Sequence, residues 1–397
     1  MKYDFTTILD RSNVHAVAID KIPMEGAEVK EGFSKIPMWI ADMNFATVPS
    51  IQEEIIKRVN HPTYGYYITP PEYYDAIINW HKVRNGIEDM KQEYIGYENG
   101  VLGCVASAIQ AFTVPGEAIF LHSPAYIGFQ GTVRKNGRNM VFSELVKDEQ
   151  GIWRMDYEDM DKKIKENQIH FAIFCNPHNP TGRSWDKEEI EQAMQVFKKN
   201  QCVVVSDEIW SDILSPETKH IPTYSVSEDA RERTISIYAP SKTFNLAGLI
   251  GSYHVIHNTY LRDRVVKQSE LSRYNMMNVL SMHALMGAYS QDGMDWVDEL
   301  NTVIRENIDY VCDFINQNLD GVSVTKPDAT YMLLLDCTEW CEKHGKSVEQ
   351  LRRKGIEVGV IWQSGEEFVC PNSIRMNLAL PHSLVVEAMD RLKKYVF

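Results

Sequence analysis

Short apolar runs alternate with amphipathic stretches through the middle of the chain. The runs are rich in β-branched residues and have the length of buried strands, whereas the stretches between them have helical spacing. The expected strands are Ala118–His122, Met140–Ser143, His170–Cys175, Cys202–Ser206 and Thr234–Tyr238. The expected helices are Val101–Ala111, one that starts after Tyr126, 156–166 and 186–200. This alternation predicts an α/β fold with a largely parallel sheet covered by helices on both faces.

The two ends of the chain have a different pattern. Residues 1–48 are irregular, and Pro49 and Pro71 each open a helix. Helices near 259–272, 276–291 and 296–318 lead to a second alternating unit. Its expected strands are Tyr331–Asp336, Val358–Trp362 and Ile374–Leu380, and its expected helices are Val348–Lys354 and Leu384–Tyr395. We expect an N-terminal segment (1–48) that packs with the small domain, a large domain (49–290) and a small C-terminal α/β domain (291–397).

Charge and cysteine content exclude some classes of partner. A formal charge of −14, with no basic block, argues against nucleic acid and anionic membranes as partners. No apolar run reaches the roughly 18 residues of a membrane span, and the N-terminus lacks the pattern of a signal peptide. The seven cysteines have no framework spacing, which indicates reduced thiols and a cytoplasmic protein. Cys337, Cys341 and His344 have no second Cys/His pair nearby, so no metal site is expected.

Polar residues follow the expected strands of the large domain. Ser123, Asn176, Asp207 and Lys242 each come just after one of them. In parallel α/β sheets, ligands bind beyond the carboxyl ends of the strands. These residues therefore mark a candidate site at one edge of the predicted sheet.

Lys242 stands in the stretch APSKTFNLAG, Ala239–Gly248. A lysine after a strand is usually a solvated loop charge. Here Phe244 and Leu246 are apolar neighbours, and a lysine in such surroundings loses hydration, so its neutral amine can act as a Schiff-base nucleophile. The hypothesis is that Lys242 carries pyridoxal 5′-phosphate (PLP).

Four other residues would serve that cofactor, and each also has a plain structural explanation. Gly100 could admit a phosphate to a helix N-terminus, or simply begin the helix. Asn179, in NPHNPTG, could donate to a ring oxygen or stand in a rigid turn. Asp207, in SDEIW, could stay ionised against a pyridinium nitrogen or cap a helix. Tyr126 could stack on a flat ring or pack in the core.

The order and spacing of these motifs resemble the fold-type I PLP enzymes, the aspartate-aminotransferase superfamily. Asp207 follows Asn179 by 28 positions, and Lys242 follows Asp207 by 35. The stretches PMWIADMNFATVPSI, HPTYGYY, SPAYIGF, APSKTFNLAGLIGSY and ATYMLLLD are most similar to the PatB/MalY group of C–S β-lyases, often called cystathionine β-lyases. The resemblance covers nearly the whole chain. It implies a fold-type I PLP transferase fold, with a mixed, mostly parallel central sheet and a small α/β domain.

The resemblance also implies roles for single residues. Lys242 forms the Schiff base with PLP, and Asp207 pairs with the pyridine nitrogen. Asn179 reaches the 3′ oxygen, and Tyr126 stacks on the ring. The residues expected around the phosphate are Gly100, Val101, Leu102 and Ser241.

Three further residues concern the substrate, the partner subunit and a departure from the family pattern. Arg375, in SIRMNLALP, matches the arginine that binds the substrate α-carboxylate, together with Asn179. Tyr66, in HPTYGYY, is expected to reach the phosphate of the neighbouring subunit, which implies a homodimer with shared sites. Trp210 occupies the position where the group often has His and the superfamily Tyr, so the resemblance implies that it lies beside the 3′ oxygen. An indole N–H donates a hydrogen bond but neither accepts one nor ionises.

Three functions remain open on the sequence. The first is a β-lyase that cleaves L-cystathionine or related cysteine S-conjugates to thiol, pyruvate and ammonia. The second is a class I/II aminotransferase; a dicarboxylate substrate would need a second cation, for which Arg134 and Arg273 are the candidates. The third is a PLP-containing regulatory or binding protein, which would not need Lys242, Asp207, Asn179 and Arg375 all in these places.

Overall fold

The computed structural model describes residues 1–397, and the chain divides into two compact units. The first unit comprises Met1–Ala46, Asn179–Gly182 and Asp298–Phe397, and the second comprises Thr47–His178 and Arg183–Val297. The long helix α12 (Gln291–Asn318) contains the last boundary between them. The three-part domain division expected from the sequence remains a prediction.

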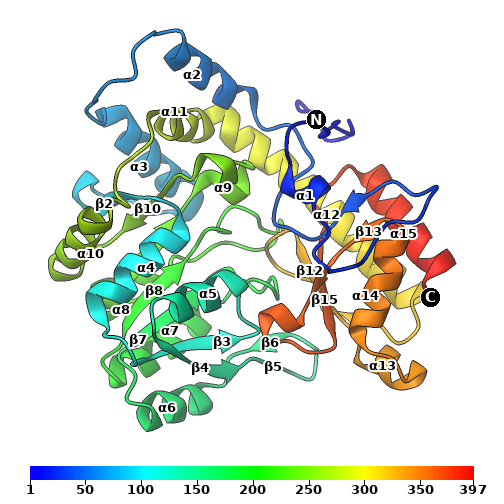
Figure 1. Cartoon of the computed structure of the whole chain (residues 1–397). Coiled ribbons are helices and arrows are strands. Elements are labelled where there is room, and N and C mark those ends of the chain that lie inside the picture. The colour runs from blue at the N-terminus through cyan, green and yellow to red at the C-terminus, as the bar shows by residue number, and fades with distance from the viewer. The chain divides into compact units, whose positions relative to one another are not determined.

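The second unit is built on a seven-stranded sheet (Figure 1). In spatial order the strands are β2 (Ile95–Glu98), β10 (Ser252–Val255), β9 (Thr234–Tyr238), β8 (Val203–Asp207), β7 (Phe171–Cys175), β3 (Ala118–Ser123) and β4 (Asn139–Glu144). The five strands from β9 to β4 are parallel, whereas β10 is antiparallel to both of its neighbours. The predicted α/β fold with a mixed, mostly parallel central sheet is confirmed.

Two apolar clusters cover the two faces of this sheet. Because successive side chains of a strand point to opposite faces, β7 contributes Ile173 to one cluster and Phe174 to the other. The helices of the first cluster are α4 (Val101–Phe112), α5 (Ile127–Lys135) and α10 (Thr259–Ser272). The helices of the second cluster are α6 (Tyr157–Glu166), α7 (Lys187–Lys199) and α8 (Glu228–Arg233). The sheet is therefore buried on both sides, as parallel sheets are.

A separate helical layer belongs to the same unit. Its members are α2 (Pro49–Val59), α3 (Pro71–Asn85) and α11 (Val279–Ala288), and α11 packs against the other two (Figure 1). Both α2 and α3 begin with proline, which suits a first helical position because proline has no N–H to donate. The loop between α2 and α3 carries the aromatic residues of HPTYGYY.

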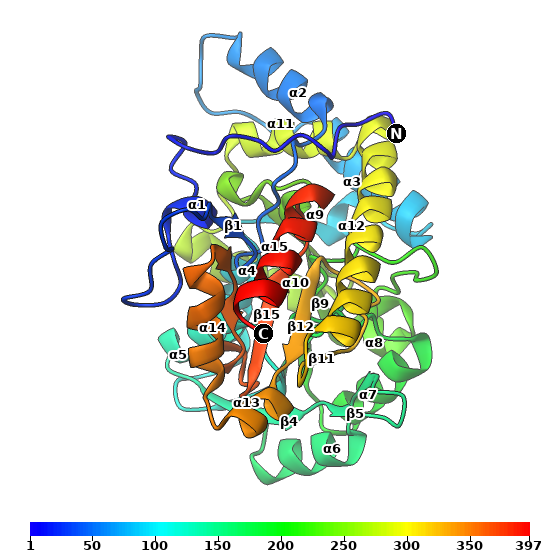
Figure 2. The same ribbon diagram turned by 90° about the vertical axis from the view of Figure 1, so that its right-hand side faces the viewer.

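The first unit contains a four-stranded antiparallel sheet. Its strands, in spatial order, are β11 (Ser323–Val324), β12 (Met332–Asp336), β15 (Ser373–Asn377) and β14 (Gln363–Ser364). The helices α14 (Val348–Glu357), α15 (His382–Tyr395) and the later part of α12 lie along one side of it (Figure 2). This unit is the small α/β domain of the predicted fold class.

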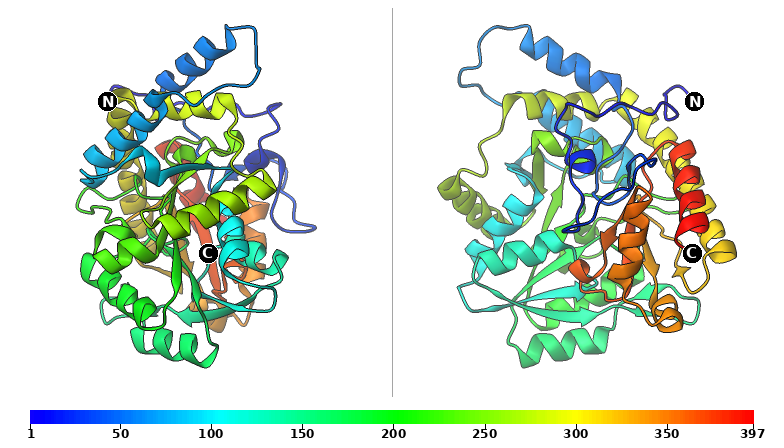
Figure 3. Two further views of the ribbon diagram at one scale, coloured as in Figure 1. Left: turned by 90° about the vertical axis from the view of Figure 1, so that its left-hand side faces the viewer. Right: turned by 45° about the vertical axis from the view of Figure 1, so that its right-hand side comes forward.

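The expected strand Val358–Trp362 is shorter in the structure, where β13 (Val360–Ile361) pairs in parallel with β1 (Ile36–Pro37). A second short strand, β14, follows it and joins the small sheet. Trp362 separates them, because its indole N–H donates to the carbonyl of Arg352 on α14 and its side chain is buried there. The pairing with β1 places the N-terminal segment beside the C-terminal elements of this unit (Figure 3, right).

The remaining elements are short. The helices are α1 (Val17–Asp20), α9 (Pro240–Thr243) and α13 (Thr338–His344), and the strands are β5 (Val146–Lys147) and β6 (Trp153–Arg154). The 3₁₀ turns are Gln92–Tyr94, Thr223–Ser225, Ala247–Leu249 and Glu366–Phe368. No helix has both the length and the apolar character needed to cross a membrane.

Candidate active site

Lys242 lies in the single-turn helix α9, directly after β9. The next residue, Thr243, is buried and donates its hydroxyl hydrogen bond to Asp212 Oδ2 at 3.1 Å. Trp80 of α3 donates its indole N–H to the other oxygen of Asp212, also at 3.1 Å. Phe244 stacks on Trp296, with ring centroids 5.5 Å apart. The backbone that carries Lys242 is thus held to α3 and to a buried aromatic cluster.

Asp207 is the last residue of β8 and lies opposite Ile237 of β9, close to the end of β9 that leads to Lys242. Its side chain is buried, and Oδ1 accepts the N–H of Ile209 at 3.1 Å. Burial raises the pKa of Asp207 to about 7; the Ile209 N–H lowers it, the Glu208 carboxylate raises it and the Lys242 ammonium lowers it. A buried carboxyl with this pKa is stabilised as an anion when a cation comes beside it. A protonated pyridine nitrogen is such a cation, so Asp207 fits the ring of PLP.

The start of α4 fits a phosphate. Gly100 precedes the helix with φ 79° and ψ 154°, a backbone conformation that favours glycine. No side chain caps α4, so the N–H groups of its first turn, which includes Val101 and Leu102, point toward its open end. A helix of this length provides an N-terminal partial positive charge. Ser241 is partly exposed in α9.

The aromatic residues of the predicted site lie in three different environments. Tyr126 precedes α5, and its ring lies against Gly128, where a Cβ atom would come within 2.4 Å of the Tyr126 ring. Trp210 follows β8 and is buried. Tyr66 is fully exposed in the loop between α2 and α3. The second unit therefore contains every predicted site residue except Asn179 and Arg375.

Asn179 and Arg375 belong to the first unit and contact each other. Arg375 lies on β15, is 3% exposed, and donates from Nη1 to Asn179 Oδ1 at 3.1 Å. The segment of Asn179 is anchored by Gly182, whose carbonyl accepts the N–H groups of Asp328 and Ala329. The sequence places Asn179 in the middle of the large domain, so this grouping with Arg375 is not visible from chain order.

Two residues of the site were missed by the sequence reasoning. Asp212 holds Thr243, and Gln363 contacts Arg375. The sequence signal for Asp212 is an acidic residue that follows the apolar pair Ile209-Trp210 in SDEIWSD, five residues after Asp207. The signal for Gln363 was a polar residue directly after an apolar run in VIWQSGEEF.

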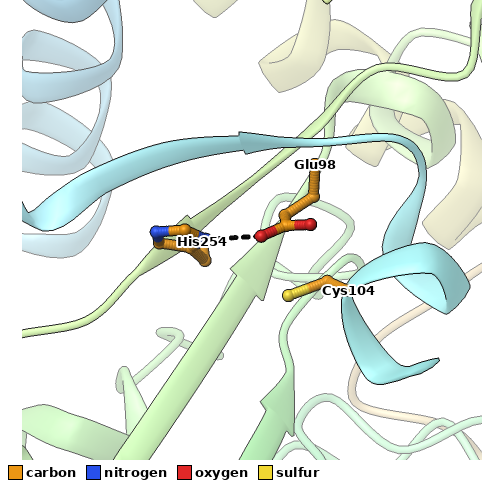
Figure 4. A group of neighbouring side chains, drawn as sticks. All are labelled: Glu98, Cys104 and His254. Carbon is orange, nitrogen blue, oxygen red and sulfur yellow. Dashed lines mark hydrogen bonds and ion pairs between the residues drawn. The ribbon is translucent and has the colours of Figure 1, made fainter. Parts of the chain in front are cut away.

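A buried polar cluster lies beside the start of α4 (Figure 4). It consists of Glu98 on β2, Cys104 on α4 and His254 on β10, whose potential metal-ligating atoms lie within 4.8 Å of one another. His254 Nδ1 is 2.8 Å from Glu98 Oε1, and the Ser269 hydroxyl donates to both Glu98 oxygens. Burial raises the pKa of the Cys104 thiol well above its ordinary value, and Glu98 raises it further. The cluster is a hydrogen-bonded connection between β2, β10 and α10.

Comparisons with known proteins identify the family of this chain and agree with its fold. The profile of the family "Aminotransferase class I and II" matches residues 35–392. Cystathionine beta-lyase PatB of Bacillus subtilis is 32% identical over 361 residues, which cover 90% of this chain and 92% of PatB. A PLP-bound putative aminotransferase from Clostridium difficile superposes with a TM-score of 0.90 at 32% identity, over the whole of both chains. A PLP-bound C–S lyase from Staphylococcus hominis has a TM-score of 0.88 at 29% identity, over 100% of this chain and 98% of the other.

The fold is that of a fold-type I PLP enzyme. The chain belongs to the aminotransferase class I and II family, and within it to the group that includes PatB. The family depends on PLP, so the predicted cofactor is confirmed at the level of the family.

Proposed function

We propose that the protein is a PLP-dependent C–S β-lyase that cleaves L-cystathionine or related cysteine S-conjugates to a thiol, pyruvate and ammonia. The observation that carries this proposal is the similarity to PatB along 90% of the chain, together with the buried Asp207 near the end of the strand that leads to Lys242. The lyase from Staphylococcus hominis supports the same reaction class.

Lys242 and Asp207 supply the protein's part of the chemistry. When bound, PLP accepts the electron pair of the substrate Cα–H bond. Lys242 Nζ would hold the cofactor and, when released from it, would be the base that removes the Cα proton. Asp207 would keep its negative charge opposite the ring nitrogen and so hold that nitrogen protonated. Departure of a thiolate from Cβ would complete the α,β-elimination, and hydrolysis of the released enamine by water would give pyruvate and ammonia.

Other side chains orient the two ligands. We propose that Arg375 binds the substrate α-carboxylate and that Asn179 serves both the carboxylate and the 3′ oxygen. Tyr126 stacks on the ring, with Trp210 as a donor beside the 3′ oxygen. The residues proposed to hold the phosphate are Gly100, Val101, Leu102 and Ser241.

We also propose that the protein works as a cytoplasmic homodimer that acts on a small amino-acid substrate, with no nucleic-acid or membrane partner. None of the seven cysteines forms a disulfide, which suits a reducing compartment. Tyr66 is fully exposed, and Ile68 next to it in the loop is 91% exposed. A cavity of about 680 Å³ lies under this loop, with Tyr97 and Met276 among its lining residues. Exposed apolar surface of this kind is typical of an interface, and a second copy would bring Tyr66 to its partner's phosphate.

The aminotransferase is the second candidate. The Clostridium difficile relative at 32% identity is described as a putative aminotransferase, and the family name points the same way. In that reaction Lys242 would deliver the proton to C4′ of the cofactor, and no thiolate would leave from Cβ. The two reactions share Lys242, Asp207 and Arg375 and differ in their need for a keto acid.

One experiment separates the two functions. Purified protein is incubated with L-cystathionine without any keto acid, while pyruvate and free thiol are measured. We expect equal amounts of both over many turnovers, and Lys242→Ala should lose this activity together with the visible absorbance of the PLP Schiff base. Turnover that appears only after a keto acid is added would favour the aminotransferase. An unchanged absorbance band in Lys242→Ala would show that Lys242 does not form the Schiff base with PLP.

A further inference from the structure

Gln363 lies between a cation and an anion. It is opposite Arg375 in the pairing of β14 with β15, and the residue is 7% exposed. Its Oε1 accepts from Arg375 Nη2, and its Nε2 donates to Glu367 Oε2 at 2.8 Å. A guanidinium can only donate and an ionised carboxylate can only accept. The orientation of the Gln363 amide is therefore fixed from both ends.

Three further contacts of Arg375 in this unit are with neutral groups. Nη1 donates to Asn179 Oδ1, and Nη2 also donates to the carbonyl oxygen of Trp39 at 2.9 Å. The ring of Phe368 lies under the guanidinium, with Cζ 4.4 Å from the ring centroid. Each of these contacts holds the guanidinium in place through a neutral group.

We propose that Gln363 is a positioning residue that sets the preference of Arg375 for a carboxylate-bearing substrate. Gln363 holds the guanidinium in place through a neutral oxygen, whereas a carboxylate at the same position would satisfy Arg375 internally and compete with the substrate. Glu367 acts through Gln363, because it keeps the amide oxygen turned toward Arg375. This inference rests on the proposed role of Arg375 in binding the substrate α-carboxylate.

The test compares a ligand that has a carboxylate with one that lacks it. L-Alanine and L-alaninamide are used as competitive inhibitors of cystathionine cleavage by the holoenzyme. In Gln363→Glu we expect the Ki of L-alanine to rise about tenfold and that of L-alaninamide to stay within about twofold. The KM for cystathionine should rise by a similar factor, with kcat less affected. Gln317→Glu adds the same charge at an exposed position of α12 and should change neither Ki.

A second variant removes the hydrogen bonds without adding charge. Gln363→Met has nearly the same volume, and we expect a rise of a few-fold in the Ki of L-alanine alone. Equal changes for both inhibitors, or no change in either Gln363 variant, would overturn the proposal. Arg375→Lys distinguishes two outcomes: that Gln363 does not position Arg375, or that Arg375 does not bind the substrate carboxylate at all. If Arg375→Lys leaves the ratio of the two Ki values unchanged, the carboxylate role of Arg375 is itself wrong.

Discussion

A single buried carboxyl group, Asp207, links cofactor binding to pH. Its pKa in the folded protein without PLP is raised by burial from 3.8 to about 7. Between these two values the unfolded chain has lost the proton that the folded chain retains, so folding stability falls as pH rises through this window and is level above it. The full loss is at most about 4 kcal/mol. Asp207→Asn has no such titration.

We therefore predict that the thermal midpoint of cofactor-free Asp207→Asn rises relative to wild type as the pH increases from 4 to 8. Thermal unfolding at a series of pH values measures the difference. With PLP bound, wild type should instead have the higher thermal midpoint, because its carboxylate then faces the protonated ring nitrogen. Asp75→Asn, at an exposed position of α3, is the control and should follow wild type at every pH. A difference between Asp207→Asn and wild type that does not vary with pH would contradict the prediction.

The same residue scale explains which parts of the site the sequence could predict. Lys242 and Asp207 stand directly after apolar strands, and their spacing along the chain matches a known family. Gln363 and Asp212 act through contacts with residues distant in sequence, and no local pattern encodes such contacts. Chain order gives Asn179 to the large domain, although its hydrogen bond to Arg375 places it with the small one.

At the scale of elements, the start of α4 carries the next prediction. Gly100 has a positive φ, and a Cβ atom there would lie 3.4 Å from Ile250 Cγ2. Gly100→Ala should cost roughly 1–3 kcal/mol of stability and distort the first turn of α4. If that turn binds the phosphate, the variant should lose affinity for PLP by at least about tenfold and much less for pyridoxal, which has no phosphate. Absorbance titrations of the cofactor-free protein measure both affinities.

A matched glycine controls for backbone strain. Gly86, after α3, also has a positive φ, and no atom lies within 4 Å of the position of its Cβ. Gly86→Ala should destabilise the protein without changing the ratio of the two affinities. Equal losses for PLP and pyridoxal in Gly100→Ala would place the phosphate elsewhere.

Element patterns also show where periodicity succeeds and fails. Strands such as β7 are uniformly apolar because both faces of the sheet are covered, and their sequence is unmistakable. The strand β10 was not expected, because Ser252 and His254 interrupt its apolar pattern; both hydrogen-bond to Glu98. The expected strand Val358–Trp362 contains β13 but not β14, because the break at Trp362 depends on a tertiary contact of its indole with α14.

At the scale of the whole molecule, the question is whether one chain makes a complete site. Tyr66 is fully exposed in the single chain. It is proposed to bind phosphate, which from this exposed position requires contact with a second copy of the chain. Tyrosine and methionine side chains form much of the lining of the cavity under the loop of Tyr66, beside the polar Glu98 and His254, and they favour contact with an apolar partner surface. The assembly should therefore be an isologous dimer in which each subunit supplies Tyr66 to the other.

Mixed dimers test this arrangement. Tyr66→Ala and Lys242→Ala are each expected to be nearly inactive as pure proteins, the first through weakened PLP binding and the second through loss of the base. In a mixed dimer, one site combines Lys242 from one subunit with Tyr66 from the other and is intact. Equimolar unfolding and refolding of the two variants should therefore restore roughly a quarter of the wild-type site activity. Activity no greater than the sum of the two pure variants, in a sample that light scattering shows to be dimeric, would mean that Tyr66 serves its own subunit.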